Sequence, residues 1–322
     1  MKKLFAALCC AVLPAVLPAA ALADDFPSRA IKLVVGFPPG GSNDVVARII
    51  APKMAELLKQ PVVVENRPGA NATLGTGQVA RAEPDGYTIT LGSLSPLVIA
   101  LATYDNLPYD TAKDFEPINT VALTPEVIAV HPSVEVKTLP ELVALSKTKQ
   151  VSLSSSGNGG LPHLAIELLK KVSGGNFLHV PYKGAGPAVV DAMGGHVNGV
   201  IMDLPALATQ VKGGKLRAIA VTNRERTSVL PDVPTSGEQG LEGVQAVNWF
   251  ALMAPAKTPA AVVAKLNEVL VKVCAMPEVK EEFARSGVSA FNQASPDAFR
   301  KFLGEEIDRW GSIAREAGAK AN

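Results

Sequence analysis

Cysteine is scarce in this sequence, which limits the covalent and metal chemistry that it can support. Only three of the 322 residues are cysteine, and Cys9 and Cys10 both lie in the N-terminal segment. Cys274 is the single cysteine after that segment, which excludes an internal disulfide and a thiolate metal cluster in the rest of the chain. Stability there must come from packing.

An excess of charge of one sign is absent as well. The 31 Lys and Arg residues balance 30 Asp and Glu residues, for a net charge of +1. Proteins that bind nucleic acids usually carry a basic surface, and a near-neutral chain gives no sign of one. We therefore expect no nucleic-acid partner.

Aromatic residues are also few. They make up 5% of the sequence, whereas hydrophobic residues make up 48%. Cores built mainly of Ala, Val, Leu and Ile are typical of parallel sheets that are buried on both faces. After the N-terminal segment, no apolar run approaches the length of about 20 residues that a membrane-spanning helix needs. The composition therefore favours an α/β protein.

The N-terminal segment has the three-part layout of a secretory signal. Lys2 and Lys3 precede an apolar run from Leu4 to Leu22, and an Ala-x-Ala site ends at Ala23. The alternative is a membrane anchor, but two prolines interrupt the run and small residues occupy the cleavage site. We predict that residues 1–23 are a signal peptide cleaved after Ala23, and that the mature protein is secreted.

Short β-rich runs alternate with amphipathic segments along the rest of the chain. This alternation predicts βαβ units with parallel sheets. Strands are expected at 31–35, 62–65, 87–91, 127–131, 151–155, 177–181, 200–202, 216–221 and 249–254. Helices are expected at 43–58, 139–146, 163–172, 188–193, 204–212, 259–274 and 296–317.

The length and the order of these elements predict two lobes. A chain of this size exceeds what one hydrophobic core usually supports. Proline-bearing connections divide the elements into an N-terminal, a middle and a C-terminal set. We assign lobe 1 to residues 24–123 plus 225–322 and lobe 2 to residues 124–224, with the chain crossing near 124–125 and 222–223.

Two glycine-rich loops carry the clearest chemical signal. Gly36 to Asp44 follows the first expected strand and opens a helix, and Ser156 to Pro162 does the same in the middle set. Glycine lets the backbone approach a ligand closely, and amides at a helix start bind anions. For the first loop alone, a tight turn with a helix cap is an equal alternative. The second loop favours two opposed rows of amides that hold one anion.

Nucleotide-binding motifs do not fit. Gly36 and Gly41 have the P-loop spacing, but Ser42 stands where that motif requires lysine. Residues 75–80 match the dinucleotide fingerprint loosely and lack a well-placed acidic residue after the next strand. We therefore expect no cofactor.

Catalytic and metal-binding motifs are missing too. The four histidines show no metalloprotease spacing, and no Gly-x-Ser-x-Gly elbow occurs. We predict no catalytic residue and no metal site. A triad assembled only by folding stays open, for example one in which Ser42 or Ser155 meets a histidine.

Ordered motifs along nearly the whole mature length make the chain resemble the Bug-type, or tripartite tricarboxylate transporter, substrate-binding receptors of bacterial periplasms. The motifs that carry the resemblance are Pro27-Ser28-Arg29, Val34 to Asp44, Val62 to Ala70, Pro84 to Thr88, Leu107 to Asp110, Ser155 to Gly159, His179 to Gly184, Gly213 to Ala218, Leu230 to Thr235 and Ala254 to Ala256. One departure is Gly160-Leu161-Pro162, where family members often have Ser after Gly-Asn-Gly and a polar residue before His.

The resemblance implies a two-lobed, type II-like periplasmic binding protein, each lobe a mainly parallel sheet flanked by helices, with a ligand cleft between the lobes. It implies capture of a small mono-, di- or tricarboxylate or aromatic acid, and delivery to membrane transporter subunits of the tripartite tricarboxylate type. A monomer is the simpler expectation for such a carrier. A ligand receptor for a sensor kinase, or a secreted hydrolase, is the alternative function.

The loops and the resemblance together define the expected ligand-binding residues. Asp203 has two readings of equal weight, since it could contact the ligand or cap the following helix. Tyr182 and Lys183 could also be a packed aromatic and a solvated charge. The expected residues are Phe37, Gly40, Gly41, Ser42, Asn43, Asp44, Ser93, Ser95, Ser155, Ser156, Gly157, Asn158, Gly159, Tyr182, Lys183, Gly184, Ala185 and Asp203.

Overall fold

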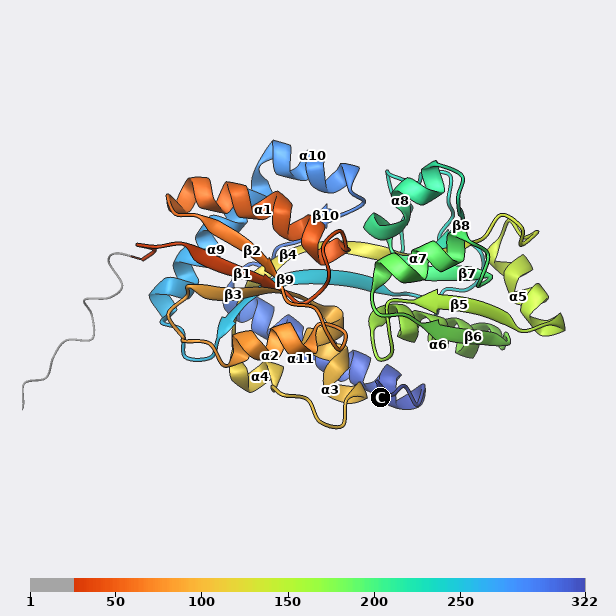
Figure 1. The fold of residues 1–322 in the computed structure, drawn as a ribbon, viewed down its shortest axis with the longest axis horizontal. Helices are drawn as coiled ribbons and strands as arrows, with labels where there is room; N and C mark the ends of the chain where they lie inside the picture. The colour runs from red at the N-terminus through yellow and green to blue at the C-terminus, as the bar shows by residue number, and fades with distance from the viewer. Residues whose placement is uncertain (1–25, 322) are drawn as a thin grey trace, which may run out of the picture.

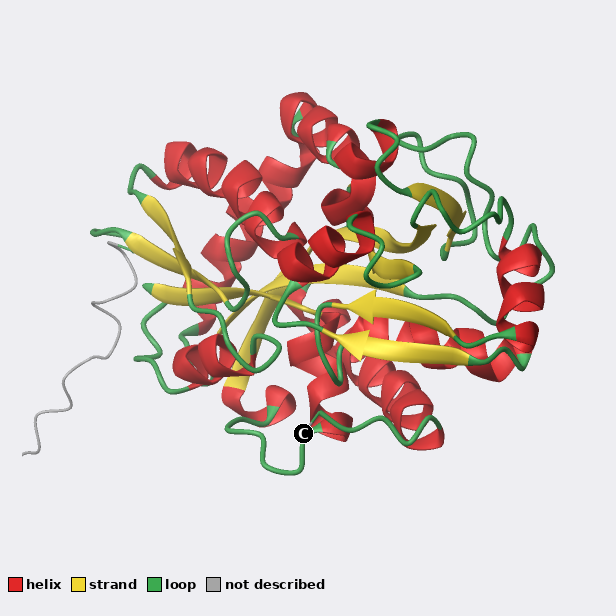
Figure 2. Ribbon diagram, turned by 45° about the vertical axis from the view of Figure 1, so that its right-hand side comes forward, coloured by secondary structure: helices red, strands yellow, loops and turns green. Residues whose placement is uncertain are grey.

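The computed structural model describes residues 26–321 (Figure 1). The predicted signal peptide lies outside these residues. Within them the strands form one continuous path in the order β2-β1-β3-β9-β4-β7-β5-β6, with β8 and β10 also pairing with β4. Helices lie on both sides of the strands (Figure 2). None of the helices in this part of the chain is long and apolar enough to cross a membrane.

One half of the path, called the first sheet, is built on β1 (Ile31–Val35). β2 (Val62–Asn66) and β3 (Thr88–Ser93) flank β1 and run parallel to it. β9 (Val247–Pro255) pairs antiparallel with β3, and the first half of β4 (Phe115–Val130) pairs antiparallel with β9. The sheet is therefore mixed, with its parallel part at the N-terminal strands.

The second half of β4 begins the other half of the path, called the second sheet. β7 (Gly199–Asp203) and β8 (Arg217–Val221) pair antiparallel with it. β5 (Val151–Ser155) lies between β7 and β6 (Phe177–Pro181) and is parallel to both. Because β4 belongs to both sheets, it connects the two lobes directly.

The helices enclose three hydrophobic cores. One core lies between the first sheet and α1, α9 and α10, another between the second sheet and α7 and α8, and the third runs under both sheets, against α2, α6 and α11. The helices and short elements are α1 (Ser42–Leu58), α2 (Thr73–Ala80), the π-helix η2 (Ser95–Ile99), α3 (Ala100–Thr103), α4 (Thr111–Asp114), α5 (Leu139–Thr148), α6 (Leu161–Ser173), α7 (Ala185–Met193), α8 (Leu204–Lys212), α9 (Ala260–Ala275), α10 (Pro277–Arg285), β10 (Ser289–Ala290) and α11 (Pro296–Glu316).

β4 is much longer than the strand expected at 127–131. Prolines in a sequence argue against a central strand, because proline cannot donate to the ladder. Here the pairing with β9 shifts register near Pro117 and again at Thr120, so irregular pairing accommodates the early part of the strand. At the boundary of the sheets, Glu126 N–H donates to the Ala246 carbonyl at 3.2 Å, and the Glu126 carbonyl accepts from Thr222 N–H at 3.0 Å.

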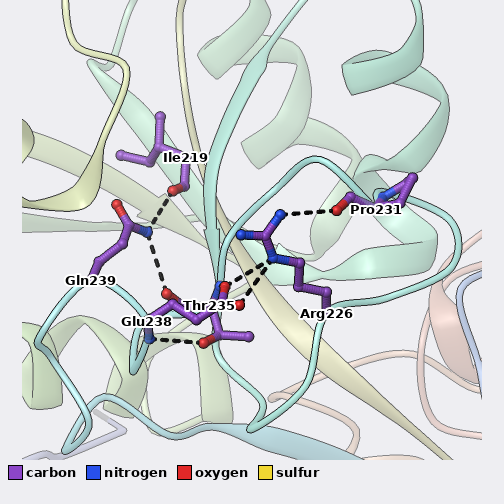
Figure 3. A network of polar contacts seen from close by, with 6 residues as sticks. All are labelled: Ile219, Arg226, Pro231, Thr235, Glu238 and Gln239. Carbon is purple, nitrogen blue, oxygen red and sulfur yellow. Dashed lines mark hydrogen bonds and ion pairs between the residues drawn. The ribbon is translucent and has the colours of Figure 1, made fainter.

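The segment 225–246 packs against the second sheet, whereas the sequence predicted it as part of lobe 1. The Gln239 side chain donates to the Ile219 carbonyl at 2.9 Å and accepts from Leu139 N–H at 2.8 Å. Arg226 and Glu238 pair within the segment at 3.0 Å (Figure 3). We therefore propose that the return crossing lies near Ala246, at the start of β9.

Candidate functional site

A cavity of about 340 Å³ lies between the two sheets. The loop before α1 and the end of β3 line it from the first sheet, and α7, α8 and the end of β7 line it from the second. Eleven of the expected residues contribute to this main cavity: Phe37, Gly40, Gly41, Ser42, Asn43, Ser93, Ser95, Ser156, Gly184, Ala185 and Asp203.

A neighbouring cavity of about 440 Å³ shares the wall formed by Phe37, Pro38, Ser156 and Gly184. Four further expected residues line only this second cavity, namely Gly157, Asn158, Tyr182 and Lys183. Three expected residues line neither cavity, and these are Asp44, Ser155 and Gly159. The structure therefore brings most of the set together on two adjoining hollows.

The N-terminus of α1 opens into the main cavity without a side-chain cap. Gly41 occupies the capping position and supplies no side chain, and Gly41, Ser42 and Asn43 all line the cavity. The first amides of a helix have no acceptor inside the helix. Together with the positive end of the helix dipole, these amides form a site suited to an anion.

Asp44 orders this loop rather than lining the cavity. Its carboxylate accepts from Gly40 N–H and Arg48 Nε at 2.9 Å, and from Asn66 Nδ2 at 3.0 Å. Burial acts to raise the pKa of Asp44, but these hydrogen bonds outweigh burial and lower the pKa. Asp44 is therefore a charged brace for the glycine loop, and a direct ligand contact has no geometric support.

The second glycine-rich loop differs from the expected row of free amides. The Gly159 amide donates to His163 Nδ1 at 3.1 Å, and the Leu161 amide donates to Ser95 Oγ at 3.0 Å. Gly160 occupies the N-cap position of α6 and has no side chain that could accept a hydrogen bond from the helix. The Ser95 hydroxyl, from the first lobe, accepts that hydrogen bond instead. These two amides at the start of α6 already have acceptors.

Asp203 lies at the boundary of the sheets and faces the main cavity. Asn248 Nδ2 donates to both of its carboxylate oxygens, at 3.2 and 3.0 Å, and Ser42 is a further hydrogen-bond partner. Burial raises the pKa of Asp203, and the neighbouring Glu126 carboxyl, then Ser42 and Asn248, offset part of that effect. Asp203 precedes α8, but its side chain makes no capping hydrogen bond, which excludes the helix-cap interpretation.

Glu126 lies beside Asp203, as its register partner between β4 and β7. Its side chain is completely buried, and neither carboxyl oxygen has a hydrogen-bond partner within 3.5 Å. Burial, together with the nearby Asp203 carboxylate, raises the pKa of Glu126 well above its usual range. Glu126 is thus the uncharged member of the pair at neutral pH.

Ser155 and His179 form a serine–histidine contact between two strands, which could suggest a hydrolase. Ser155 Oγ lies 2.6 Å from His179 Nε2, and the His179 ring stacks on His163. Ser155 is fully buried and lines neither cavity. Within residues 26–321 no carboxylate hydrogen-bonds to His179, and no group of three His, Cys, Asp or Glu side chains could hold a metal ion. The contact therefore joins a buried serine to a partly exposed, stacked histidine and has a structural role.

Sequence reasoning missed Asn248 and the apolar wall of the cavity. Asn248 reaches the cavity from β9, where it also accepts from the Leu94 amide at 3.3 Å. It is a polar residue in an otherwise apolar strand, which is the only signal that could have drawn attention to it. The apolar wall comes mainly from Val189, Val190 and Met193 of α7.

Comparisons with known proteins agree on one family. The profile described as "Tripartite tricarboxylate transporter family receptor" matches residues 46–319. The chain is 38% identical to protein BugT of Bordetella pertussis, over 99% of both chains. A solved periplasmic binding protein, BugD, superposes with a TM-score of 0.86 at 35% identity, covering 92% of this chain and 99% of that one.

Two solved structures with ligands are similar as well. A protein of R. palustris solved with adipate has a TM-score of 0.88 at 31% identity, with 92% of this chain and 99% of that one covered. MatC of Rhodopseudomonas palustris, solved with bound malate, has a TM-score of 0.83 at 31% identity, with 89% and 99% covered.

Proposed function

This chain belongs to the tripartite tricarboxylate transporter receptor family, a family of periplasmic solute-binding proteins, and we propose that it captures a small carboxylate and delivers it to membrane transporter subunits of the tripartite tricarboxylate type. The observation that carries the proposal is the uncapped N-terminus of α1, which opens into the cavity between the two sheets. We further propose that the mature protein acts in the periplasm as a monomer.

A carboxylate suits this helix start for two reasons. The first-turn amides of α1 donate hydrogen bonds that nothing within the helix accepts, and the helix dipole favours a negative charge there. Similar proteins have been solved with adipate and with malate, both of them carboxylates. The two lines of support are independent. The first comes from the N-terminus of α1 in this chain, and the second comes from the ligands found in similar proteins.

Closure of the lobes on the ligand provides the mechanism. Main-cavity residues come from the loop before α1 on one side and from α7 and α8 on the other. A ligand that touches both sides binds the closed form more tightly than the open form, and this difference in affinity drives closure. No covalent step is needed.

A thermal-shift screen of the mature protein against a panel of carboxylates and matched uncharged amides tests the binding step. A ligand that binds only the folded state raises the midpoint, by an amount that grows with its concentration over Kd. We expect at least one carboxylate to raise the midpoint while its amide does not. If no acid has any effect, or if amides match their acids, the carboxylate proposal is wrong.

The delivery step needs a separate experiment with the membrane subunits. We expect the ligand-loaded protein to be retained by detergent-solubilised transporter subunits of this type, and the ligand-free protein to be retained more weakly. Failure of the loaded protein to associate with them would contradict delivery and leave the binding step intact.

A further inference from the structure

The described side chains that line the main cavity include one acidic group and no basic group. Asp203 is the only ionisable side chain that lines it, and no lysine, arginine or histidine of the described residues 26–321 reaches it. The polar remainder consists of hydroxyl, amide and backbone groups. A cavity that accepts an anion at one end therefore also contains one fixed negative charge and no side-chain cation.

The negative charge resides on Asp203 rather than on Glu126 behind it. Asp203 accepts two hydrogen bonds from Asn248 and has Ser42 as a further partner, and these donors favour its ionised form. Glu126 has no such donors within 3.5 Å, and burial beside Asp203 raises its pKa well above the usual range. The pair thus presents a single carboxylate to the cavity.

Asp203 lies next to the anion site, not at the far end of the cavity. Ser42 is the first residue of α1, so the same residue belongs to the helix start and contacts the Asp203 carboxyl. Ser93 lines the same cavity with a hydroxyl that is buried and has no hydrogen-bond partner. A ligand there meets donors for an anion and acceptors for a cation within one small region.

The wall opposite the α1 N-terminus is mainly apolar, and Gln210 of α8 is its polar member. Its apolar members are Val189, Val190 and Met193 of α7, with Met202 and Ala206. Val190 is 59% exposed although it is a large apolar side chain, and it faces the cavity. Exposed apolar surface in a concave site is typical of contact with an apolar part of a ligand.

From this arrangement we propose that the ligand is an apolar α-amino acid, held as a zwitterion. Its carboxylate meets the first amides of α1, its ammonium group donates to Asp203, and its side chain packs against α7. The inference rests on the proposed function and narrows it, because it names the class of carboxylate.

A dicarboxylate fits less well. If its first carboxylate occupied the α1 N-terminus, the rest of the molecule would lie beside Asp203 with no cationic side chain in the main cavity. Lys183 lines only the neighbouring cavity, beyond the shared wall of Phe37 and Ser156. Burying like charges together without a counter-ion is costly, so Asp203 would select against a second carboxylate.

Calorimetry with matched ligand pairs tests the inference. The probes are alanine, valine, leucine and phenylalanine, the deamino acid of each, and glutarate and adipate as dicarboxylates. We expect at least one amino acid to bind about tenfold or more tighter than its deamino acid, because a buried charge pair is lost without the amine. This comparison uses the wild-type protein, so it does not depend on how any variant folds.

The Asp203→Asn variant then assigns the preference to this residue. Asparagine has the same size and keeps an acceptor for Asn248, so we expect the preference for the amino acid over its deamino acid to disappear. Glu126→Gln is the matched control, since it leaves the Asp203 charge in place, and the preference should persist.

The outcomes separate the inference from the proposed function. Tighter binding of a deamino acid or a dicarboxylate to the wild type, or an undiminished preference in Asp203→Asn, would overturn the amino-acid inference and leave a carboxylate receptor. If no acid with or without an amine binds, the proposed function fails together with the inference.

Discussion

The hydroxyl of Ser95 accepts a hydrogen bond from the Leu161 amide at 3.0 Å, and in doing so one lobe caps a helix of the other. Thr103, on the same side as Ser95, places its hydroxyl 3.3 Å from the Gly159 carbonyl and 3.1 Å from the Ile99 carbonyl, so its single O–H donor is shared between the two. The two contacts between the lobes are buried and link the segment after β3 to the loop before α6. They link parts of the molecule that would have to separate in the proposed opening of the cleft.

Removing the Thr103 contact should therefore favour the open form. Thr103→Val keeps the shape of the side chain and lies outside both cavities, so the ligand contacts are unchanged. A typical hydrogen bond contributes about 1 kcal/mol and this hydroxyl is shared with the Ile99 carbonyl, so we expect ligand affinity to fall by up to about fivefold. Small-angle scattering of the ligand-free protein should show a larger radius of gyration.

Thr111→Val is the matched control for that variant. It makes the same chemical change at a buried hydroxyl that has no hydrogen-bond partner. Scattering and affinity should stay at their wild-type values. If Thr103→Val behaves like Thr111→Val, the contact between the lobes does not oppose opening.

The amide at the start of α1 can be tested by a pair of substitutions at Ser42. Ser42→Ala removes the hydroxyl and keeps the amide, whereas Ser42→Pro removes both. Proline is well tolerated at the first position of a helix, so the fold should survive. Hydrogen bonds to charged groups contribute about 1.5–3 kcal/mol, so we expect the proline variant to bind the ligand about tenfold or more weaker than the alanine variant.

Calorimetry on the two Ser42 variants gives the comparison directly. The unfolding midpoint without ligand serves as the check that both variants are folded. Equal affinities would show that the Ser42 amide does not contact the ligand, and the anion site would then have to be sought elsewhere.

Local signals in the sequence predicted much of the fold. β5 and β6 are short β-rich runs bounded by turn residues, and α8 has a proline at its start, so each was predicted with its observed bounds. β4 was missed in part because Pro117 and Pro125 argue against a central strand. The register shifts that accommodate β4 depend on its partner β9, which is far away in sequence.

The candidate site also has one part that the sequence predicted and another that it could not predict. The loop before α1 was predicted because glycines, a cap-type residue and a helix start are adjacent in the sequence. The partners of the second loop could not be predicted, since Ser95 is 66 positions away from Leu161. Asn248 is likewise brought to Asp203 only by the return of the chain to the first sheet.

Glu126 offers a test of charge burial at the boundary of the sheets. Its raised pKa means that the folded protein keeps a proton that the unfolded chain loses above about pH 4.5, the ordinary value for this group. Folded-state stability therefore falls as the pH rises from that value toward the folded pKa. Glu126→Gln cannot titrate, so we expect it to be more stable than the wild type at neutral pH, and the gap to shrink toward pH 4.

Glu306→Gln is the control, because Glu306 is a buried glutamate whose carboxylate has hydrogen-bond donors. Glu306 Oε2 accepts from the indole nitrogens of Trp249 and Trp310, at 2.9 and 3.1 Å. Weakening these bonds should lower the free energy of unfolding, the opposite sign to Glu126→Gln. Denaturant unfolding at pH 4.5 and 7.5 measures both variants. A destabilised Glu126→Gln at pH 7.5 would contradict the assigned charge state.

His179 should make the protein less stable in mild acid. Burial, and then the neighbouring His163, lower the pKa of His179 to about 3, compared with 6.5 for the ordinary group. Between these values the unfolded chain binds a proton that the folded protein does not, so stability is fully present above pH 6.5 and is lost as the pH falls. One such proton contributes a slope of at most about 1.4 kcal/mol per pH unit, less here because the ring is partly exposed.

Carboxylates also titrate in this range, so the contribution of His179 has to be measured as a difference in slope. His179→Gln removes the titrating ring and retains a group that can hydrogen-bond with the Ser155 hydroxyl. Its free energy of unfolding should be lower at pH 7, since the stacking on His163 is lost, but should decline less steeply between pH 6.5 and 4.5. His196→Gln, at a side chain that is 72% exposed, is the control for removing an imidazole from the surface. Parallel curves for all three proteins would mean that the folded protein takes up a proton at His179 as readily as the unfolded chain.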